Sequence, residues 1–137
     1  MLKILLVDDS KSAQLKIHEI LSQYGECDQA YNGVEALEYF TNSIQSNTPY
    51  DLIVMDVVMP KMDGFQATKE IMALEDKENI PEKKRAKIIM LTSKTEPKHM
   101  IKAQFEIGVT TYITKPFADE TLIEALRNLS LLDSSTK

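Results

Sequence analysis

The sequence predicts a doubly wound α/β domain, built from five βα units around a five-stranded parallel sheet. Five short apolar runs alternate along the chain with segments of helical spacing, an order typical of parallel sheets joined by right-handed crossovers. The first, third and fourth runs are almost continuous in Ile, Leu, Val and Met, as expected of strands covered on both faces. The 137 residues suit one domain, and we expect the strand order 2-1-3-4-5.

The predicted strands coincide with the five apolar runs. They are Lys3–Val7, Cys27–Tyr31, Asp51–Met55, Lys87–Leu91 and Thr111–Thr114. The second run is the least apolar, so we place it at an edge of the sheet.

Four of the remaining segments carry apolar residues at intervals of three and four, which is the spacing of one helix face. The faces are Ala13, Ile17, Ile20, Leu21 and Tyr24; Leu37, Phe40 and Ile44; Phe65, Thr68, Ile71 and Met72; and Leu122, Ala125, Leu126 and Leu129. A further helix is expected over Pro97–Ile107, because proline suits a first turn and Gly108 suits a helix end.

Local signals also predict where two helices begin. Asn32 with Glu35, and Asp63 with Gln66, have the spacing of a capping box. The charge-dense segment Glu75–Lys87 is expected to extend the third helix and then to form a long loop.

Composition and charge restrict the function classes. The net charge is −5, and no basic stripe is present, which argues against binding to nucleic acid. The longest apolar runs have about five residues, whereas a membrane helix needs about 20. Cys27 is the only cysteine, which suits a reducing cytoplasm. We expect a cytoplasmic protein with a domain at 1–132, a frayed tail at 133–137 and no output domain.

Polar residues stand where four of the predicted strands end. Asp8 and Asp9 follow the first strand, Asp56 the third, Thr92 the fourth and Lys115 the fifth. Because ligands gather at the carboxyl ends of strands in open α/β sheets, these side chains are expected to share one crevice. Three close carboxylates repel one another, and Mg²⁺, which prefers oxygen ligands, would relieve that repulsion.

Such a crevice suits phosphoryl transfer to Asp56. One carboxylate oxygen would remain free to attack phosphorus, while Lys115 and Mg²⁺ supply positive charge and Thr92 donates a hydrogen bond. Each residue alone has an ordinary structural explanation, such as a helix cap or a strand end. Their joint occurrence at four strand ends favours a functional site.

Four segments, in this order, resemble the receiver domain of bacterial two-component response regulators: LLVDDS, DLIVMDVVMPKMDG, IIMLTS and YITKPF. The resemblance covers about residues 2–130 and implies a CheY-like, flavodoxin-like fold. It implies that Asp56 is the phosphoacceptor and that Thr92 and Lys115 contact the phosphoryl group. The implied Mg²⁺ ligands are Asp8, Asp9, Asp56 and the backbone carbonyl of Val58.

The same resemblance implies a conformational switch. Tyr112 would be the switch aromatic that turns when Thr92 moves, and the peptide bond before Pro116 would be cis. Val58 and Lys94 occupy positions that tune dephosphorylation in this family. Here one is apolar and the other long and charged, so the lifetime of the phosphorylated state is left open.

We therefore expect a single-domain response regulator, a monomer or a weak dimer. A histidine kinase or phosphotransfer protein would phosphorylate Asp56, and a surface around the fourth helix, fifth strand and fifth helix would change its affinity for a partner. That partner is either a direct target or the next member of a relay. The chain would catalyse only its own phosphorylation and dephosphorylation.

Two other functions remain open. A pseudo-receiver would act as a scaffold without phosphorylation, although all the required side chains are present. A phosphatase of the haloacid-dehalogenase type would also use a strand-end Asp and Mg²⁺. That class usually has a D-x-D arrangement after its first strand, which Asp8-Asp9-Ser10 lacks.

Overall fold

The computed structural model describes residues 1–93 and 111–132. The predicted helix over Pro97–Ile107 and the predicted tail at 133–137 lie outside these ranges. The described elements are β1 (Leu2–Val7), α1 (Lys11–Leu21), β2 (Gly25–Ala30), α2 (Gly33–Gln45), β3 (Leu52–Asp56), α3 (Gly64–Lys77), the short 3₁₀ helix η1 (Glu82–Lys84), β4 (Lys87–Ser93), β5 (Tyr112–Lys115) and α5 (Asp119–Asn128).

The five strands are parallel and lie in the order β2-β1-β3-β4-β5, as predicted. β2 is at an edge of the sheet, but it begins at Gly25 rather than at Cys27. The reason is that β2 pairs with β1 from Leu2↔Gly25 to Val7↔Ala30. Backbone pairing thus extends beyond the residues whose side chains are apolar.

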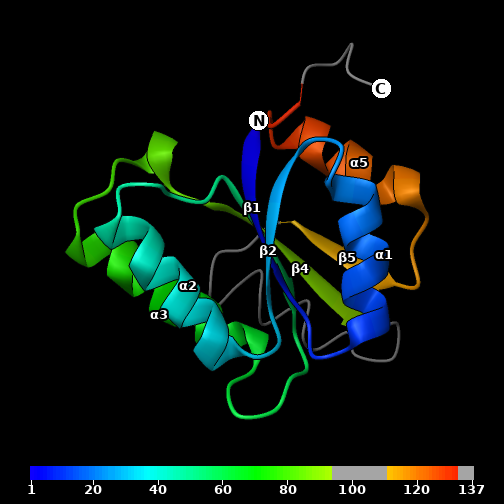
Figure 1. Cartoon of the computed structure of the whole chain (residues 1–137), viewed down its shortest axis with the longest axis horizontal. Coiled ribbons are helices and arrows are strands. Elements are labelled where there is room, and N and C mark those ends of the chain that lie inside the picture. The colour runs from blue at the N-terminus through cyan, green and yellow to red at the C-terminus, as the bar shows by residue number, and fades with distance from the viewer. Residues whose placement is uncertain (94–110, 133–137) are drawn as a thin grey trace.

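Alternate side chains of the strands enter two separate cores. One core lies under α2 and α3 and includes Leu5, Ile53 and Met90. The other lies under α1 and α5 and includes Leu6 and Val54. Figure 1 shows the two helix pairs on opposite sides of the sheet. Burial on both faces explains why the central strands are continuous apolar runs in the sequence.

Both predicted helix starts are confirmed. Asn32 Oδ1 accepts a hydrogen bond from the backbone N–H of Glu35 at 2.9 Å, and Asp63 Oδ1 accepts one from Gln66 at 2.8 Å. The Glu35 carboxylate accepts from the N–H of Tyr31 at 2.9 Å, one residue before the cap. These contacts satisfy N–H groups that have no partner within the helix.

The segment Glu75–Lys87 extends α3 and then forms a loop, as predicted. Glu75 is buried and accepts a hydrogen bond from the N–H of Ala86 at 2.9 Å. Arg85 forms an ion pair with Asp76 at 2.6 Å. The charged residues of this loop therefore fasten it to α3.

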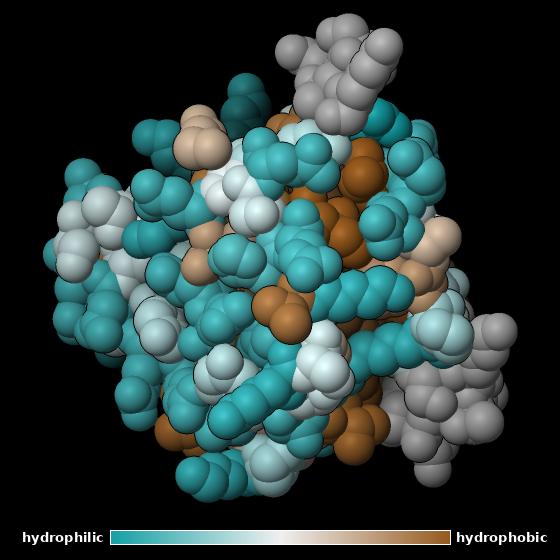
Figure 2. All heavy atoms as spheres, turned by 45° about the vertical axis from the view of Figure 1, so that its right-hand side comes forward, coloured by the Kyte–Doolittle hydropathy of each residue, from teal (hydrophilic) through white to brown (hydrophobic). Residues whose placement is uncertain are grey.

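The surface on the side of α1 and α5 is mostly hydrophilic. Figure 2 shows apolar groups there in separate areas. Among the described helices, none has the length and apolar character that a membrane crossing requires.

Candidate functional site

Three charged side chains reach the carboxyl edge of the sheet from neighbouring strands. Asp8, Asp56 and Lys115 each stand two residues after a buried member of the core under α1 and α5. Since side chains alternate along a strand, all three point toward that same side. The same alternation of side chains that buries the apolar core thus places these polar side chains together at the end of the sheet.

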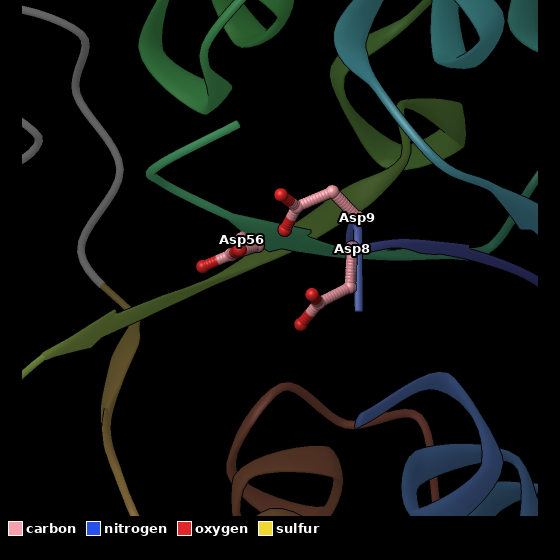
Figure 3. A group of neighbouring side chains, drawn as sticks. All are labelled: Asp8, Asp9 and Asp56. Carbon is pink, nitrogen blue, oxygen red and sulfur yellow. The ribbon is translucent and has the colours of Figure 1, made fainter. Parts of the chain in front are cut away.

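The three aspartates form a cluster. One carboxylate oxygen each of Asp8, Asp9 and Asp56 lies within 4.8 Å of the others. Asp8 is 1% exposed and Asp56 8% exposed, whereas Asp9 is exposed to solvent. In Figure 3, Asp8 extends toward the side of α1 and α5, and Asp9 extends to the opposite side. Two carboxylates of the cluster, those of Asp8 and Asp56, are therefore buried, and that of Asp9 is accessible to solvent.

Lys115 links the two buried carboxylates. Its Nζ lies 2.8 Å from Asp8 Oδ2 and 3.4 Å from Asp56 Oδ1. The peptide bond between Lys115 and Pro116 is cis, as the family resemblance implied. Lys115 pairs with two of the three clustered carboxylates, so among the described residues this cluster keeps an excess of negative charge.

Burial and the charges of the pocket both change the pKa values of the site. Burial raises the pKa of the Asp56 carboxyl to about 6, and the Asp8 charge adds to this rise while Lys115 opposes it. Burial lowers the pKa of Lys115. Its hydrogen bond to Asp8 and the charges of Asp56 and Asp8 outweigh that effect and raise the pKa above its ordinary value. Lys115 therefore stays charged at neutral pH.

The donor set fits a hard divalent cation. Carboxylate oxygens are the ligands that Mg²⁺ prefers, and Mg²⁺ usually takes few of them and keeps several waters. Three carboxylate oxygens within 4.8 Å can supply that set. Burial and the neighbouring Asp8 charge, which raise the pKa of Asp56, both disfavour its ionised form, and a bound cation would favour that form.

The backbone around Asp8 is held on several sides. Asp8 Oδ1 accepts a hydrogen bond from the N–H of Ser10 at 3.0 Å. The side chain of Ser10 accepts from the N–H of Ala13 at 3.3 Å and caps α1. Gln14, buried in α1, donates to the carbonyl of Asp8 at 3.2 Å. The sequence reasoning missed Gln14, although its spacing of three and seven from Ile17 and Leu21 could have placed it on the buried face.

The loop after β3 packs tightly against Asp56. The N–H of Gly64 donates to the carbonyl of Val57 at 2.8 Å. A Cβ atom at Gly64 would overlap the carbonyl oxygen of Asp56, so only glycine fits here without a shift. Val58 follows at the surface, with its side chain exposed.

Thr92 and Tyr112 lie on the other side of the sheet. Thr92 is buried in β4 and is in register with Thr114, while Tyr112 is in register with Met90. Thr92 and Tyr112 therefore share the face that carries Met90, on neighbouring strands. Tyr112 is 36% exposed. Lys94 lies outside the described residues.

Comparisons with known proteins agree with this geometry. Residues 4–127 match the model of the response regulator receiver domain. The chain is 38% identical to the chemotaxis protein CheY of Halobacterium salinarum, over 93% of this chain and 95% of that protein. It is 34% identical to the transcriptional regulatory protein ResD of Bacillus subtilis, over 98% of this chain but 50% of that protein.

A solved structure shows the same architecture. The chemotaxis protein CheY4 of Vibrio cholerae superposes with a TM-score of 0.73 and 32% identity, over 93% of this chain and 98% of that chain. The family match spans nearly the whole chain, and the strand order is the expected one. The chain therefore belongs to the response regulator receiver domain family and is CheY-like in fold.

Proposed function

We propose that this chain is a response regulator that accepts a phosphoryl group on Asp56 in a Mg²⁺-dependent reaction. One observation carries the proposal: Lys115 contacts both Asp8 and Asp56. The three aspartates also lie close enough to share a cation. Phosphoryl transfer depends mainly on positioning and on neutralising charge. This pocket offers an acceptor carboxylate, one fixed ammonium group and the ligands for a cation.

In the proposed step, one Asp56 oxygen forms a bond to the phosphorus of a donor phosphohistidine. The bond between that phosphorus and the imidazole nitrogen breaks, and the imidazole keeps the electron pair. The product is an acyl phosphate, and a water that attacks its phosphorus restores the carboxylate and releases inorganic phosphate. Lys115, 3.4 Å from Asp56 Oδ1, would pair with a phosphoryl oxygen. Bound Mg²⁺ would supply further positive charge to the phosphoryl oxygens.

Asp8, Asp9 and Asp56 would hold the Mg²⁺, together with the backbone carbonyl of Val58. Asp9 is exposed to solvent, so its carboxylate can bind an ion that enters from solution. Asp8 Oδ2 is already paired with Lys115 at 2.8 Å, so Asp9 would contact the ion more directly than Asp8.

The phosphoryl group would then bias a two-state packing. Its new charge would recruit the Thr92 hydroxyl, and Tyr112 would turn toward the space that Thr92 leaves. This coupling is supported by the position of Thr92 and Tyr112 on the same face of the sheet, on neighbouring strands. The surface near β5 and α5 would change its affinity for a target or for the next relay member. The donor would be a histidine kinase or phosphotransfer protein in the cytoplasm, with residues 1–132 as the working unit.

Incubation with acetyl phosphate and Mg²⁺ tests the proposal. Intact-mass measurement should show the addition of one phosphoryl group to the wild type and none to Asp56→Asn. Asp119→Asn is the matched control, because Asp119 is an exposed aspartate outside the cluster, and it should be phosphorylated like the wild type. An unmodified wild type, or a modified Asp56→Asn, would contradict the proposal.

The same protein separates the two alternatives. Repeated release of phosphate from small monoesters would favour a phosphatase, and we expect none. A failure to bind beryllofluoride with Mg²⁺ would favour a scaffold that works without phosphorylation.

A further inference from the structure

A glutamine occupies the buried face of α1, beside the strand that carries Asp8. Gln14 is 1% exposed, and the other buried residues of this helix are aliphatic. Its Nε2 lies within hydrogen-bonding distance of three backbone carbonyls, those of Ala30 at 2.8 Å, Leu6 at 3.1 Å and Asp8 at 3.2 Å. The amide has two N–H groups, so one of them is shared between two carbonyls. One side chain thus joins the ends of two strands to the first helix.

The contacts of Gln14 lie at the end of the pairing between β1 and β2. The register of β1 and β2 stops at Val7↔Ala30, and Asp8 lies beyond this last pair. The N–H of Asp8 donates to the carbonyl of Ala30 at 3.1 Å, and its carbonyl accepts from Gln14. Both peptide groups of Asp8 are therefore fixed, one by β2 and the other by Gln14. Any shift of this backbone would carry the Asp8 carboxylate away from Lys115.

The hydrogen bonding of Gln14 is incomplete. The Oε1 of Gln14 is buried and has no hydrogen-bond partner among the described residues. An unpaired buried acceptor costs about 1–3 kcal/mol, and a methionine of similar size would avoid that cost. The donor contacts to the carbonyls of Ala30, Leu6 and Asp8 offset that cost, and the contact to Asp8 is the one that reaches the cation site.

We propose that Gln14 is a positioning residue for the cation site, which holds the backbone of Asp8 so that its carboxylate stays beside Asp9 and Asp56. This inference rests on the proposed function, because the cation belongs to it. Loss of a group that orients a metal-binding residue typically lowers metal affinity by about 10- to 100-fold. Gln14→Met removes the donor and keeps the volume of the side chain.

Mg²⁺ itself is the probe in the test. Calorimetric titration gives its affinity, and the initial rate of phosphorylation by acetyl phosphate is measured against Mg²⁺ concentration. Gln14→Met should raise the half-saturating Mg²⁺ concentration by at least about tenfold and leave the rate at saturating Mg²⁺ within about twofold of the wild type. In an Asp8→Asn background, the same substitution should cause no further rise. A defect in folding alone would lower the amplitude without moving the half-saturation point.

Gln23→Met is the matched control. Gln23 is an exposed glutamine just after the end of the same helix, and its Nε2 donates to the carbonyl of Ile20 at 2.9 Å. This variant should bind Mg²⁺ like the wild type. If Gln14→Met does not fold by circular dichroism, Gln14→Asn takes its place with the same expectations, because it withdraws the amide by one methylene.

Two results would overturn the inference about Gln14. One is an unchanged Mg²⁺ affinity, and the other is an equal loss of affinity whether or not Asp8→Asn is also present. A wild type that binds Mg²⁺ but is not phosphorylated would refute the proposed function, while the calorimetric titration would still decide the role of Gln14. A wild type that does not bind Mg²⁺ would refute both.

Discussion

The buried carboxylate of Asp56 should destabilise the metal-free protein at neutral pH, and Asp56→Asn should remove that effect. Burial, followed by the charge of Asp8, raises the pKa of Asp56 from 3.8 to about 6, against the opposing effect of Lys115. The folded state therefore binds this proton more tightly than the unfolded chain does. The resulting stabilisation is fully present below a pH of about 4 and is lost as the pH rises through about 6.

The expected magnitude follows from the two pKa values. At about 1.4 kcal/mol for each pH unit, the difference between 3.8 and about 6 corresponds to about 3 kcal/mol. This is an upper value, because structural relaxation weakens the interactions of buried charges. Asparagine keeps the shape of the side chain without its charge, and the ion pair between Lys115 and Asp8 at 2.8 Å remains. Asp56→Asn should therefore unfold with a free energy about 2–3 kcal/mol higher than the wild type at a pH of about 8.

Urea unfolding in the presence of EDTA, between about pH 4 and about pH 8, measures this difference. The advantage of Asp56→Asn should be near zero at the acidic end and should grow until the pH passes about 6. Saturating Mg²⁺ should reduce it, because the ion binds the folded wild type more tightly than the variant. Asp119→Asn, which changes an exposed aspartate in the first turn of α5, should lose less than about 1 kcal/mol and should show no gain in stability as the pH passes about 6. Equal stability of Asp56→Asn and wild type at the alkaline end, or a difference that does not depend on pH, would refute this reasoning.

Substitutions at three further positions test the site and the backbone around it. Lys115→Met should slow phosphorylation by acetyl phosphate about 100-fold, because it removes the fixed positive charge; a rate near that of the wild type would show that the cation alone suffices. Gly64→Ala should lower the free energy of unfolding in urea by about 1–3 kcal/mol, because its Cβ would meet the Asp56 carbonyl; an unchanged midpoint would exclude this contact. Asp63→Ala should cost about 1 kcal/mol in the same assay through loss of the α3 cap, and Asp63→Asn should recover most of it.

The order of elements and most of their limits could be predicted from the sequence. Continuous apolar runs identify strands that are buried on both faces, and Asn32 and Asp63 identify helix starts through contacts that span only three residues. Two strands differ more from their predicted limits: β2 begins at Gly25 instead of Cys27, and β4 ends at Ser93 instead of Leu91. Apolar patterns report which side chains are buried, whereas a strand is defined by the pairing of its backbone.

By itself, the sequence determined that Asp8, Asp56 and Lys115 stand at strand ends, and that a parallel sheet would bring those ends to one edge. Only the tertiary structure decided that Lys115 bridges the two carboxylates and that Gln14 holds the backbone of Asp8. The ion pair between Lys115 and Asp8 joins residues 107 positions apart. Contacts of this kind depend on the register of the strands and on the packing of α1 against the sheet, which local periodicity does not encode.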